Sequence, residues 1–192
     1  ISNAATLTVT EKTEPTTYTI STAEQLYAFA NAVNEGNTTA NAVLRADITL
    51  SGESWTPNGK ENASMYEGTF DGQGHTISGL HCSVSSGDVA GLFGVIGSSG
   101  VVKNVGIADS SVVATTGQDA YAGGVCGWNT GTIQNCYNTG EVSGTGTSSY
   151  GHVYAGGVCG WNTGTIENCY NTGDVSGTGT SSYGYVYAGG VC

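Results

Sequence analysis

Six cysteines are the residues of this 192-residue chain best suited to covalent chemistry. Cys126 and Cys136 are 10 residues apart, and Cys159 and Cys169 repeat that interval. We expect the disulfides Cys126–Cys136 and Cys159–Cys169, with the partner of Cys192 beyond the end of the chain. Buried free thiols and disulfides between neighbouring strands are the alternatives, since strands about 4.8 Å apart fall within the Cα separation that a disulfide allows. No Cys-x-x-Cys or Cys/His pair has zinc-ligand spacing, so no metal or cofactor is expected.

Carboxylates that could act as an acid and base pair are few. Polysaccharide-cleaving enzymes require carboxylates that converge on one face. Asp71 and His75 occur in the sequence FDGQGH, which is typical of a turn with Asp-mediated backbone hydrogen bonds. Asp47 lies two residues from Arg45 on an expected strand, where the two side chains would pair. These residues predict structural roles, and we expect no catalytic site.

Aromatic residues recur at one interval and are the candidate binding residues. They form three pairs, 33 residues apart: Trp128 and Trp161, Tyr137 and Tyr170, Tyr150 and Tyr183. If they point outward, they form a ladder suited to stacking on sugar rings or to contact with a protein partner. The alternative is that both tryptophans pack at a corner. Tyr150 and Tyr183 lie in the segment GTGTSSYG, whose composition fits an adaptable binding loop or a plain spacer.

A Thr-x-Thr pattern raises ice binding as another function. Thr130 and Thr132 recur as Thr163 and Thr165, and such ladders resemble those of some antifreeze proteins. The pattern occurs in only two copies and within an N-T-G-T turn, so ice binding is disfavoured.

These recurrences belong to a 33-residue repeat. Residues 121–153 read YAGGVCGWNTGTIQNCYNTGEVSGTGTSSYGHV, residues 154–186 repeat them with three changes, and a third copy begins at Tyr187. The repeat is rich in Gly, Thr, Val and Tyr and has no apolar spacing of three and four residues, which predicts short strands and tight turns. We therefore predict an all-β parallel β-helix, or solenoid, in which each repeat is one coil.

Degenerate copies upstream extend the expected solenoid. Alignment of the copies predicts two columns of inward side chains, and Cys82 is expected to be a core thiol. The first column is Phe70, Phe93, Cys126, Cys159 and Cys192; the second is Leu80, Val105, Cys136 and Cys169. Because the distance between copies varies, the segment GTGTSSYG is expected to be an outward insertion.

The beginning of the chain predicts a cap for the solenoid. Ser21 and Glu24 have capping-box spacing, and Gly36 stands where a helix would end. One apolar face is formed by Leu26, Phe29, Ala30 and Val33. A short helix over the first coil would cover an edge that otherwise invites aggregation. Residues 42–50 are expected to form the first-coil strand, with Ile48 and Leu50 on one face.

The expected organisation follows from these patterns. Residues 1–17 are a linker or the end of a preceding module, and residues 18–192 are the solenoid. Within it, residues 18–50 form the capping helix and first coil, 51–120 the degenerate coils, and 121–192 the 33-residue repeats, which we expect to continue beyond Cys192. A net charge of −11 with only 4 Lys and Arg disfavours nucleic acid, and no apolar run is long enough for membrane insertion.

Several motifs in order resemble a known family. GLFG at residues 91–94 and GVCG at 124–127 and 157–160, each followed by G-x-I/V-x-N, resemble GLUG-motif repeats. The resemblance implies bacterial adhesin-like surface proteins and accessory regions of secreted proteins such as IgA-specific peptidases. We expect a secreted or cell-surface, non-catalytic segment that binds a glycan or a host surface protein. The alternatives are a passive stalk, an accessory domain of a larger secreted enzyme, and a polysaccharide-active β-helix enzyme.

Overall fold

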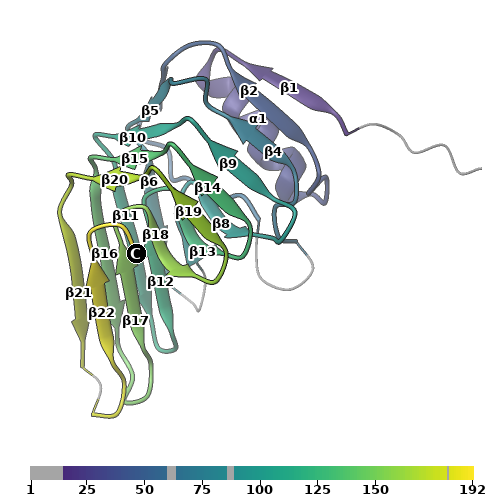
Figure 1. The fold of residues 1–192 in the computed structure, drawn as a ribbon. Helices are drawn as coiled ribbons and strands as arrows, with labels where there is room; N and C mark the ends of the chain where they lie inside the picture. The colour runs from purple at the N-terminus through teal and green to yellow at the C-terminus, as the bar shows by residue number, and fades with distance from the viewer. Residues whose placement is uncertain (1–14, 60–63, 86–88, 181) are drawn as a thin grey trace, which may run out of the picture.

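The computed structural model describes residues 15–59, 64–85, 89–180 and 182–192, and it confirms the parallel β-solenoid (Figure 1). Its one α-helix within those ranges is α1 (Ala23–Asn34), near the N-terminal end. Most of the segment expected to be a linker, residues 1–14, lies outside the described residues. No helix in the described ranges is long and apolar enough to cross a bilayer.

Five parallel sheets run along the solenoid, and successive coils supply neighbouring strands. Sheet 1 contains β1 (Thr17–Ile20), β2 (Asn41–Leu44), β4 (Thr69–Asp71), β9 (Val101–Lys103), β14 (Thr132–Gln134) and β19 (Thr165–Glu167). Sheet 2 contains β3 (Ile48–Thr49), β5 (Thr76–Ser78), β10 (Gly106–Ala108), β15 (Tyr137–Asn138) and β20 (Tyr170–Asn171). Sheet 3 contains β6 (His81–Val84), β11 (Ser111–Thr116), β16 (Glu141–Gly146) and β21 (Val175–Gly179). Sheet 4 contains β7 (Val89–Ala90), β12 (Ala120–Gly123), β17 (Val153–Gly156) and β22 (Val186–Gly189), and sheet 5 contains β8 (Phe93–Ile96), β13 (Cys126–Asn129) and β18 (Cys159–Asn162).

The 33-residue period sets the register of the last coils. Cys126 is the partner of Cys159, Thr132 of Thr165 and Tyr137 of Tyr170. Equivalent residues therefore stack along the solenoid axis. Phe93 precedes Cys126 in the same column, as predicted.

The predicted columns fail in the degenerate coils. Phe70 lies in sheet 1, in register with Val102, although its ring contacts Phe93 at 5.4 Å between centroids. Cys82 is buried as expected, but it stacks with Val112 of sheet 3. Leu80 donates its backbone N–H to Ser110 and does not align with Val105. The residue of the preceding coil in register with Phe93 is Asn58, so the sequence alignment had matched residues of two different sheets.

Sheets 3 and 4 form an arm that projects from the solenoid body in Figure 1. The segment GTGTSSYG was expected to be a loop, but its first three residues belong to β16. A Cβ at Gly144 would lie 2.6 Å from Cγ1 of Val153 on β17. Glycine at this position therefore allows the two sheets of the arm to pack closely, and only the tip of the arm is irregular.

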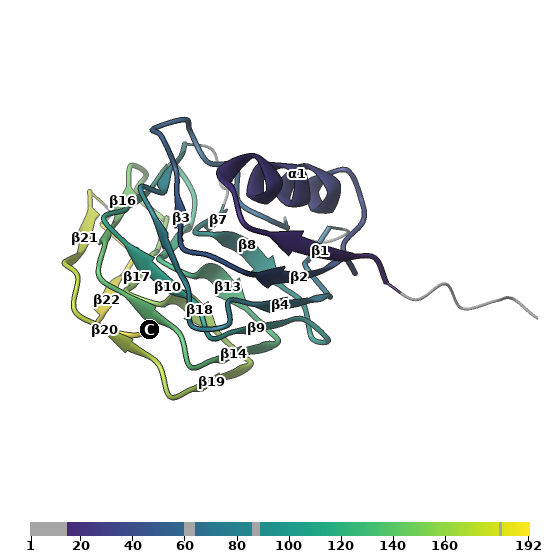
Figure 2. The ribbon, with the colours of Figure 1, turned by 90° about the horizontal axis from the view of Figure 1, so that it is seen from above.

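Helix α1 covers the first coil, as the turned view shows (Figure 2). Its predicted apolar face is buried, and Phe29 packs against Tyr18, Tyr66 and Phe70. The predicted capping box is displaced by one residue. Thr22 is the N-cap and accepts from the Gln25 N–H at 3.3 Å, while the Gln25 side chain accepts from the Ser21 N–H at 2.7 Å. Ile48 and Leu50 are both buried, as expected.

Candidate functional site

Aromatic side chains gather where sheets 4 and 5 meet. Tyr121, Tyr154 and Tyr187 stack in a column on β12, β17 and β22, with ring centroids 5.1 and 5.3 Å apart. Trp128 and Trp161 stand beside them on β13 and β18. The Tyr121–Trp128 centroids are 6.0 Å apart and the Tyr154–Trp161 centroids 4.6 Å apart. We call these five residues the aromatic corner.

The bend between the two sheets depends on glycine. A Cβ at Gly123 would lie 2.1 Å from the Cys126 carbonyl oxygen and 2.8 Å from the Cys159 Cα. No other residue type fits so close to the backbone of the same coil and of the next coil. The Gly-Gly of the YAGGVC motif thus folds the chain so that Tyr121 and Trp128 become neighbours.

Both tryptophans lie at this corner. The sequence left open whether they pack at a corner or point outward, and the structure shows some of each. Trp128 is half-buried, and its Nε1 has no hydrogen-bond partner among the described residues. Trp161 remains 38% exposed. The corner therefore presents aromatic surface at Trp161, whereas the unpaired N–H of Trp128 is itself buried.

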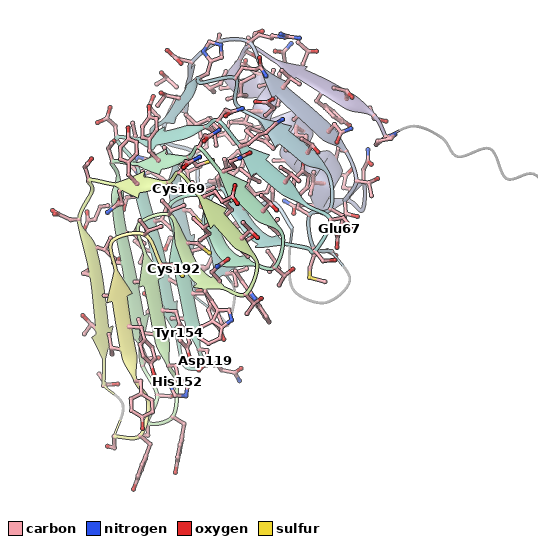
Figure 3. The ribbon with its side chains drawn as sticks, in the orientation of Figure 1. Glu67, Asp119, His152, Tyr154, Cys169 and Cys192 are labelled. Atoms are coloured by element: carbon pink, nitrogen blue, oxygen red, sulfur yellow. The ribbon has the colours of Figure 1, made fainter. Side chains whose placement is uncertain are left out.

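Asp119 connects two coils beside the corner. Its carboxylate accepts from the Tyr121 hydroxyl at 3.3 Å and from the His152 backbone N–H at 2.8 Å. Burial, and then the charge of Asp119, raise the pKa of Tyr154 above its ordinary value, so this hydroxyl stays protonated at neutral pH. Figure 3 shows Asp119, His152 and Tyr154 together on the arm.

An open hollow of about 570 Å³ lies next to Asp119, between the tips of two successive coils. Its lining combines a carboxylate, two tyrosines and small polar residues: Gly117, Gln118, Asp119, Tyr121, Ser148, Tyr150 and Gly151. The hollow can accept a polar group that donates hydrogen bonds. It is continuous with the aromatic corner through Tyr121.

Tyr150 and Tyr183 are the most exposed aromatic residues of the described chain, at 74% and 70%. Their rings stack at the tip of the arm with centroids 5.5 Å apart and an interplanar angle of 10°. The predicted outward position of this pair is therefore observed, although a binding role stays a prediction.

Tyr137 and Tyr170 stack on sheet 2, away from the aromatic corner, with centroids 5.2 Å apart. The Tyr137 hydroxyl lies 2.8 Å from Thr76 Oγ1, and its ring lies over Gly106, where a Cβ would clash with it. Tyr137 is thus a packing residue between coils, and Tyr170 is the more exposed member of the pair.

The stacking of the tyrosine rings limits how a ligand can contact them. Neighbouring rings in the columns are nearly parallel, with interplanar angles of 5° for Tyr121–Tyr154 and 9° for Tyr137–Tyr170. Each ring face inside a column is therefore covered by the next ring. A ligand meets ring edges and hydroxyl groups, so hydrogen bonding fits better than the sugar-ring stacking expected from the sequence.

The cysteines do not form the predicted within-coil pairs, because all six are free thiols in the structure. Cys126 is in register with Cys159, and its sulfur donates to the carbonyls of Gly94 and Trp128. Cys136 contacts Cys169 of the next coil through a backbone N–H to sulfur distance of 3.4 Å. Cys126 lies on β13 of sheet 5, whereas Cys136 lies in the turn between β14 and β15, and each faces its counterpart in the neighbouring coil.

Asp47 and Asp71, for which the sequence predicts structural roles, take partners from adjacent coils. Asp47 lies 3.2 Å from His75 Nδ1 rather than pairing with Arg45, and Asp71 lies 3.4 Å from Lys103 Nζ. Across the described ranges, no group of three or more His, Cys, Asp or Glu side chains could hold a metal ion.

The threonines stack between coils as the Thr-x-Thr pattern predicts, but two of the four hydroxyls are hydrogen-bonded to the backbone. Thr132 is in register with Thr165 on sheet 1. The hydroxyls of Thr130 and Thr163 donate to the backbone carbonyls of Ile96 and Asn129 in the preceding coils. Because the hydroxyls of Thr130 and Thr163 hold neighbouring coils together, they are not available to bind the ordered water that an ice-binding surface requires.

Comparison with known proteins agrees with the repeat architecture. The GLUG motif matches residues 119–143 and 151–176. The chain carries two GLUG repeats. Each match begins on the arm and includes the tyrosine and tryptophan that one coil contributes to the aromatic corner. The first match ends in β16 and the second in β21, both strands of sheet 3.

The chain is similar to parts of longer proteins. A Gly-rich membrane protein of Evansella cellulosilytica is 34% identical over 65% of this chain and 15% of its own length. Halomucin of Haloquadratum walsbyi is 40% identical over 45% of this chain and 1% of its own length. A crystal structure from Bacteroides ovatus, of a protein named as an immunoglobulin A1 protease, superposes with a TM-score of 0.62 at 27% identity, covering 90% of this chain and 62% of that one.

Sequence reasoning overlooked the tyrosine column of the aromatic corner. Tyr121, Tyr154 and Tyr187 begin each copy of YAGGVC, so their recurrence was visible in the sequence. The bend that brings them against the tryptophans was not, because the sequence does not show which sheets meet at the Gly-Gly step.

Proposed function

We propose that this GLUG-repeat segment is a non-catalytic part of a secreted or cell-surface protein that binds an extended partner, a glycan or a host surface protein, along the aromatic corner and the arm tip. The observation that carries the proposal is the repetition of the corner: the same Tyr and Trp recur in register on successive coils. An extended row of equivalent contacts suits a repetitive partner.

The negative charge of the repeats restricts the class of partner. Residues 104–192 contain no Lys or Arg, whereas five carboxylates are present at positions 109, 119, 141, 167 and 174. An anionic partner would be repelled, so a neutral glycan or a neutral to basic protein surface fits best. Hydroxyl groups of such a partner can donate to Asp119 and accept from the tyrosine hydroxyls.

Names of the similar proteins support a location outside the cell. One is named as a membrane protein, one as a halomucin and one as an immunoglobulin A1 protease. Long repetitive proteins display many coils, so weak contacts per coil would add up through multivalency.

A glycan array and a panel of host matrix proteins test the proposal. The chain is compared with the double variant Trp128→Ala/Trp161→Ala, and Thr165→Ala on sheet 1 serves as an exposed control away from the corner. We expect the double variant to lose about tenfold or more in affinity, because buried aromatic anchors dominate interfaces. Absence of binding to every target would favour the passive-stalk alternative, and equal binding by the double variant would remove the corner from the interface.

A further inference from the structure

Two cysteines of successive coils face each other at the turns between sheets 1 and 2. Cys136 follows β14 and Cys169 follows β19, and the residues on both sides of them are paired in register. Adjacent parallel strands lie about 4.8 Å apart, which falls within the Cα separation of about 4.4–6.8 Å found in disulfides. The Cys136 N–H to Cys169 Sγ distance of 3.4 Å shows that the Cys169 sulfur is turned toward Cys136.

We propose that Cys136 and Cys169 form a disulfide that joins and stabilises two successive coils when the protein is oxidised. This inference goes beyond the proposed binding function and does not depend on it. It rests on the register of the two coils and on the direct contact of the two residues. Figure 3 shows Cys169 on the last complete coil, next to β20.

The surroundings of the two sulfurs favour reaction at Cys169 first. Cys136 is 1% exposed, whereas Cys169 is only partly buried. A hydrogen bond from the Cys136 thiol lowers the pKa of Cys169 to about 7, and the same contact raises the pKa of Cys136. At neutral pH Cys169 therefore carries substantial thiolate, the reactive form of a cysteine.

The oxidant is a small disulfide such as oxidised glutathione. The Cys169 thiolate attacks one sulfur of the oxidant, forming a mixed disulfide and releasing one glutathione thiolate. Cys136 then gives up its proton and attacks the Cys169 sulfur, which forms the Cys136–Cys169 bond and releases the second glutathione. Two protein thiols are oxidised and one oxidant disulfide is reduced to two thiols.

The column of Cys126, Cys159 and Cys192 is less suited to the same reaction. Cys126 and Cys159 are 0% exposed, so an oxidant cannot reach either sulfur without opening the coil. Burial is the main cause that raises the pKa of Cys159, which keeps it a thiol. Cys192 is exposed, but its hydrogen bond with Cys159 raises its pKa and keeps it a thiol. Among the cysteine pairs described, only Cys136–Cys169 has a partner that is both accessible and acidic.

Peptide mapping tests the pairing directly. The chain is incubated with oxidised glutathione, remaining thiols are alkylated, and the unfolded product is cut with chymotrypsin after its aromatic residues. Cys136 then lies in the peptide of residues 129–137 and Cys169 in that of residues 162–170, and Gln134 against Glu167 distinguishes the two by mass. We expect these two peptides to be linked.

Two other results would overturn the proposal. One is linkage of the peptide of residues 129–137 to the sequence AGGVCGW, which contains Cys126 or Cys159. The other is recovery of both Cys136 and Cys169 as alkylated thiols. Cys169→Ala should abolish the linked product, whereas Cys82→Ala, a buried cysteine of sheet 3, should leave it unchanged.

A stability measurement tests the consequence of the bond. The oxidised chain should unfold at a higher temperature than the reduced chain, and dithiothreitol should reverse the difference, because the disulfide restricts the unfolded chain. Cys169→Ala should show no difference between oxidising and reducing conditions. Equal midpoints for the oxidised and reduced native chain would overturn the stabilising role.

Discussion

Buried asparagines at the turns satisfy the backbone of each coil. Asn129 is 0% exposed; its side-chain amide donates to the Asn162 Oδ1 at 2.8 Å, and its Oδ1 accepts from the Gly131 N–H at 3.1 Å. Asn138 makes the same contacts with Asn171 and Gly140. The recurring N-T-G sequence therefore builds a turn and a contact between coils with one side chain, which explains why the motif is repeated.

Asn129→Ala should destabilise the fold by about 1–3 kcal/mol, because the buried Gly131 N–H loses its acceptor. Gln134→Ala is the control: the Gln134 side chain also donates to the next coil, to the Glu167 carboxylate, but this contact is exposed, so a smaller loss is expected. Chemical denaturation of both variants measures the difference. Equal losses would show that burial does not determine the role of this ladder.

Asp71 should make the free energy of unfolding depend on pH in the acidic range. Burial raises its pKa, but hydrogen bonds from the Asn104 side chain and from Gln73, together with Lys103, lower it overall. A carboxyl whose pKa is lower in the folded chain stabilises the fold above its unfolded pKa of about 3.9, and this contribution is lost as pH falls through the folded pKa.

The expected difference in thermal midpoint between the native chain and Asp71→Asn is therefore larger at pH 6 than at pH 3. The exposed residue Asp174 provides a control substitution, Asp174→Asn, measured at the same two pH values. A difference for Asp71→Asn that is the same at both pH values would contradict the role of its ionised form.

Glycines determine how closely the two sheets of the arm pack. Gly144 on β16 faces Val153 on β17, and the equivalent Gly177 faces Val186 one coil later. Both are the first glycine of a G-T-G segment. The alternation of glycine and threonine thus places the small residue toward the partner sheet and the threonine outward.

Gly144→Ala should destabilise the arm by about 1–3 kcal/mol, because its Cβ would lie 2.6 Å from a Val153 methyl group in a closely packed interface. Gly117→Ala is the control, since the nearest atom to its Cβ is 3.8 Å away. Hydrogen exchange of the β16 and β17 amides measures the effect locally. Unchanged protection in Gly144→Ala would contradict close packing within the arm.

Helix α1 should protect the first coil from association. Phe29 is 0% exposed and contacts rings from β1 and β4, so Phe29→Ala removes much of the helix packing and should cost about 3–5 kcal/mol. The exposed helix residue Glu24 offers a control, Glu24→Ala. Light scattering on partial heating should detect oligomers earlier for Phe29→Ala. An unchanged onset would mean that the helix does not protect this end.

The sequence predicted the fold where the repeats are nearly identical and failed where they diverge. The 33-residue period determined the register of Cys126 with Cys159, whereas the similar residues around Phe70 and Phe93 were matched although they lie on different sheets. The pairing of cysteines could not be deduced, because the spacing of Cys126 and Cys136 does not show that Cys126 lies on sheet 5 while Cys136 follows the sheet 1 strand β14. The sequence left open whether the tryptophans point outward or pack at a corner, and it did not show the bend at Gly123 that brings the tyrosines against them.

At the scale of the whole molecule, repetition generates a surface rather than a single site. Each complete 33-residue repeat adds one Tyr and one Trp to the aromatic corner and one tyrosine to the arm tip. Near-identical coils present the same contacts at a regular spacing. The strength of binding should therefore grow with the number of coils.

The most direct test of binding by a repeated surface is to add one coil to the aromatic corner. A second copy of residues 121–153 is inserted after Val153, which adds one coil in register, and binding to the glycan and host-matrix panel is measured beside the native chain. A slower dissociation and a higher affinity for the same target are predicted, and both gains should vanish when the added coil carries alanine at its tryptophan position. An affinity that does not change with the added coil would contradict binding by a repeated surface.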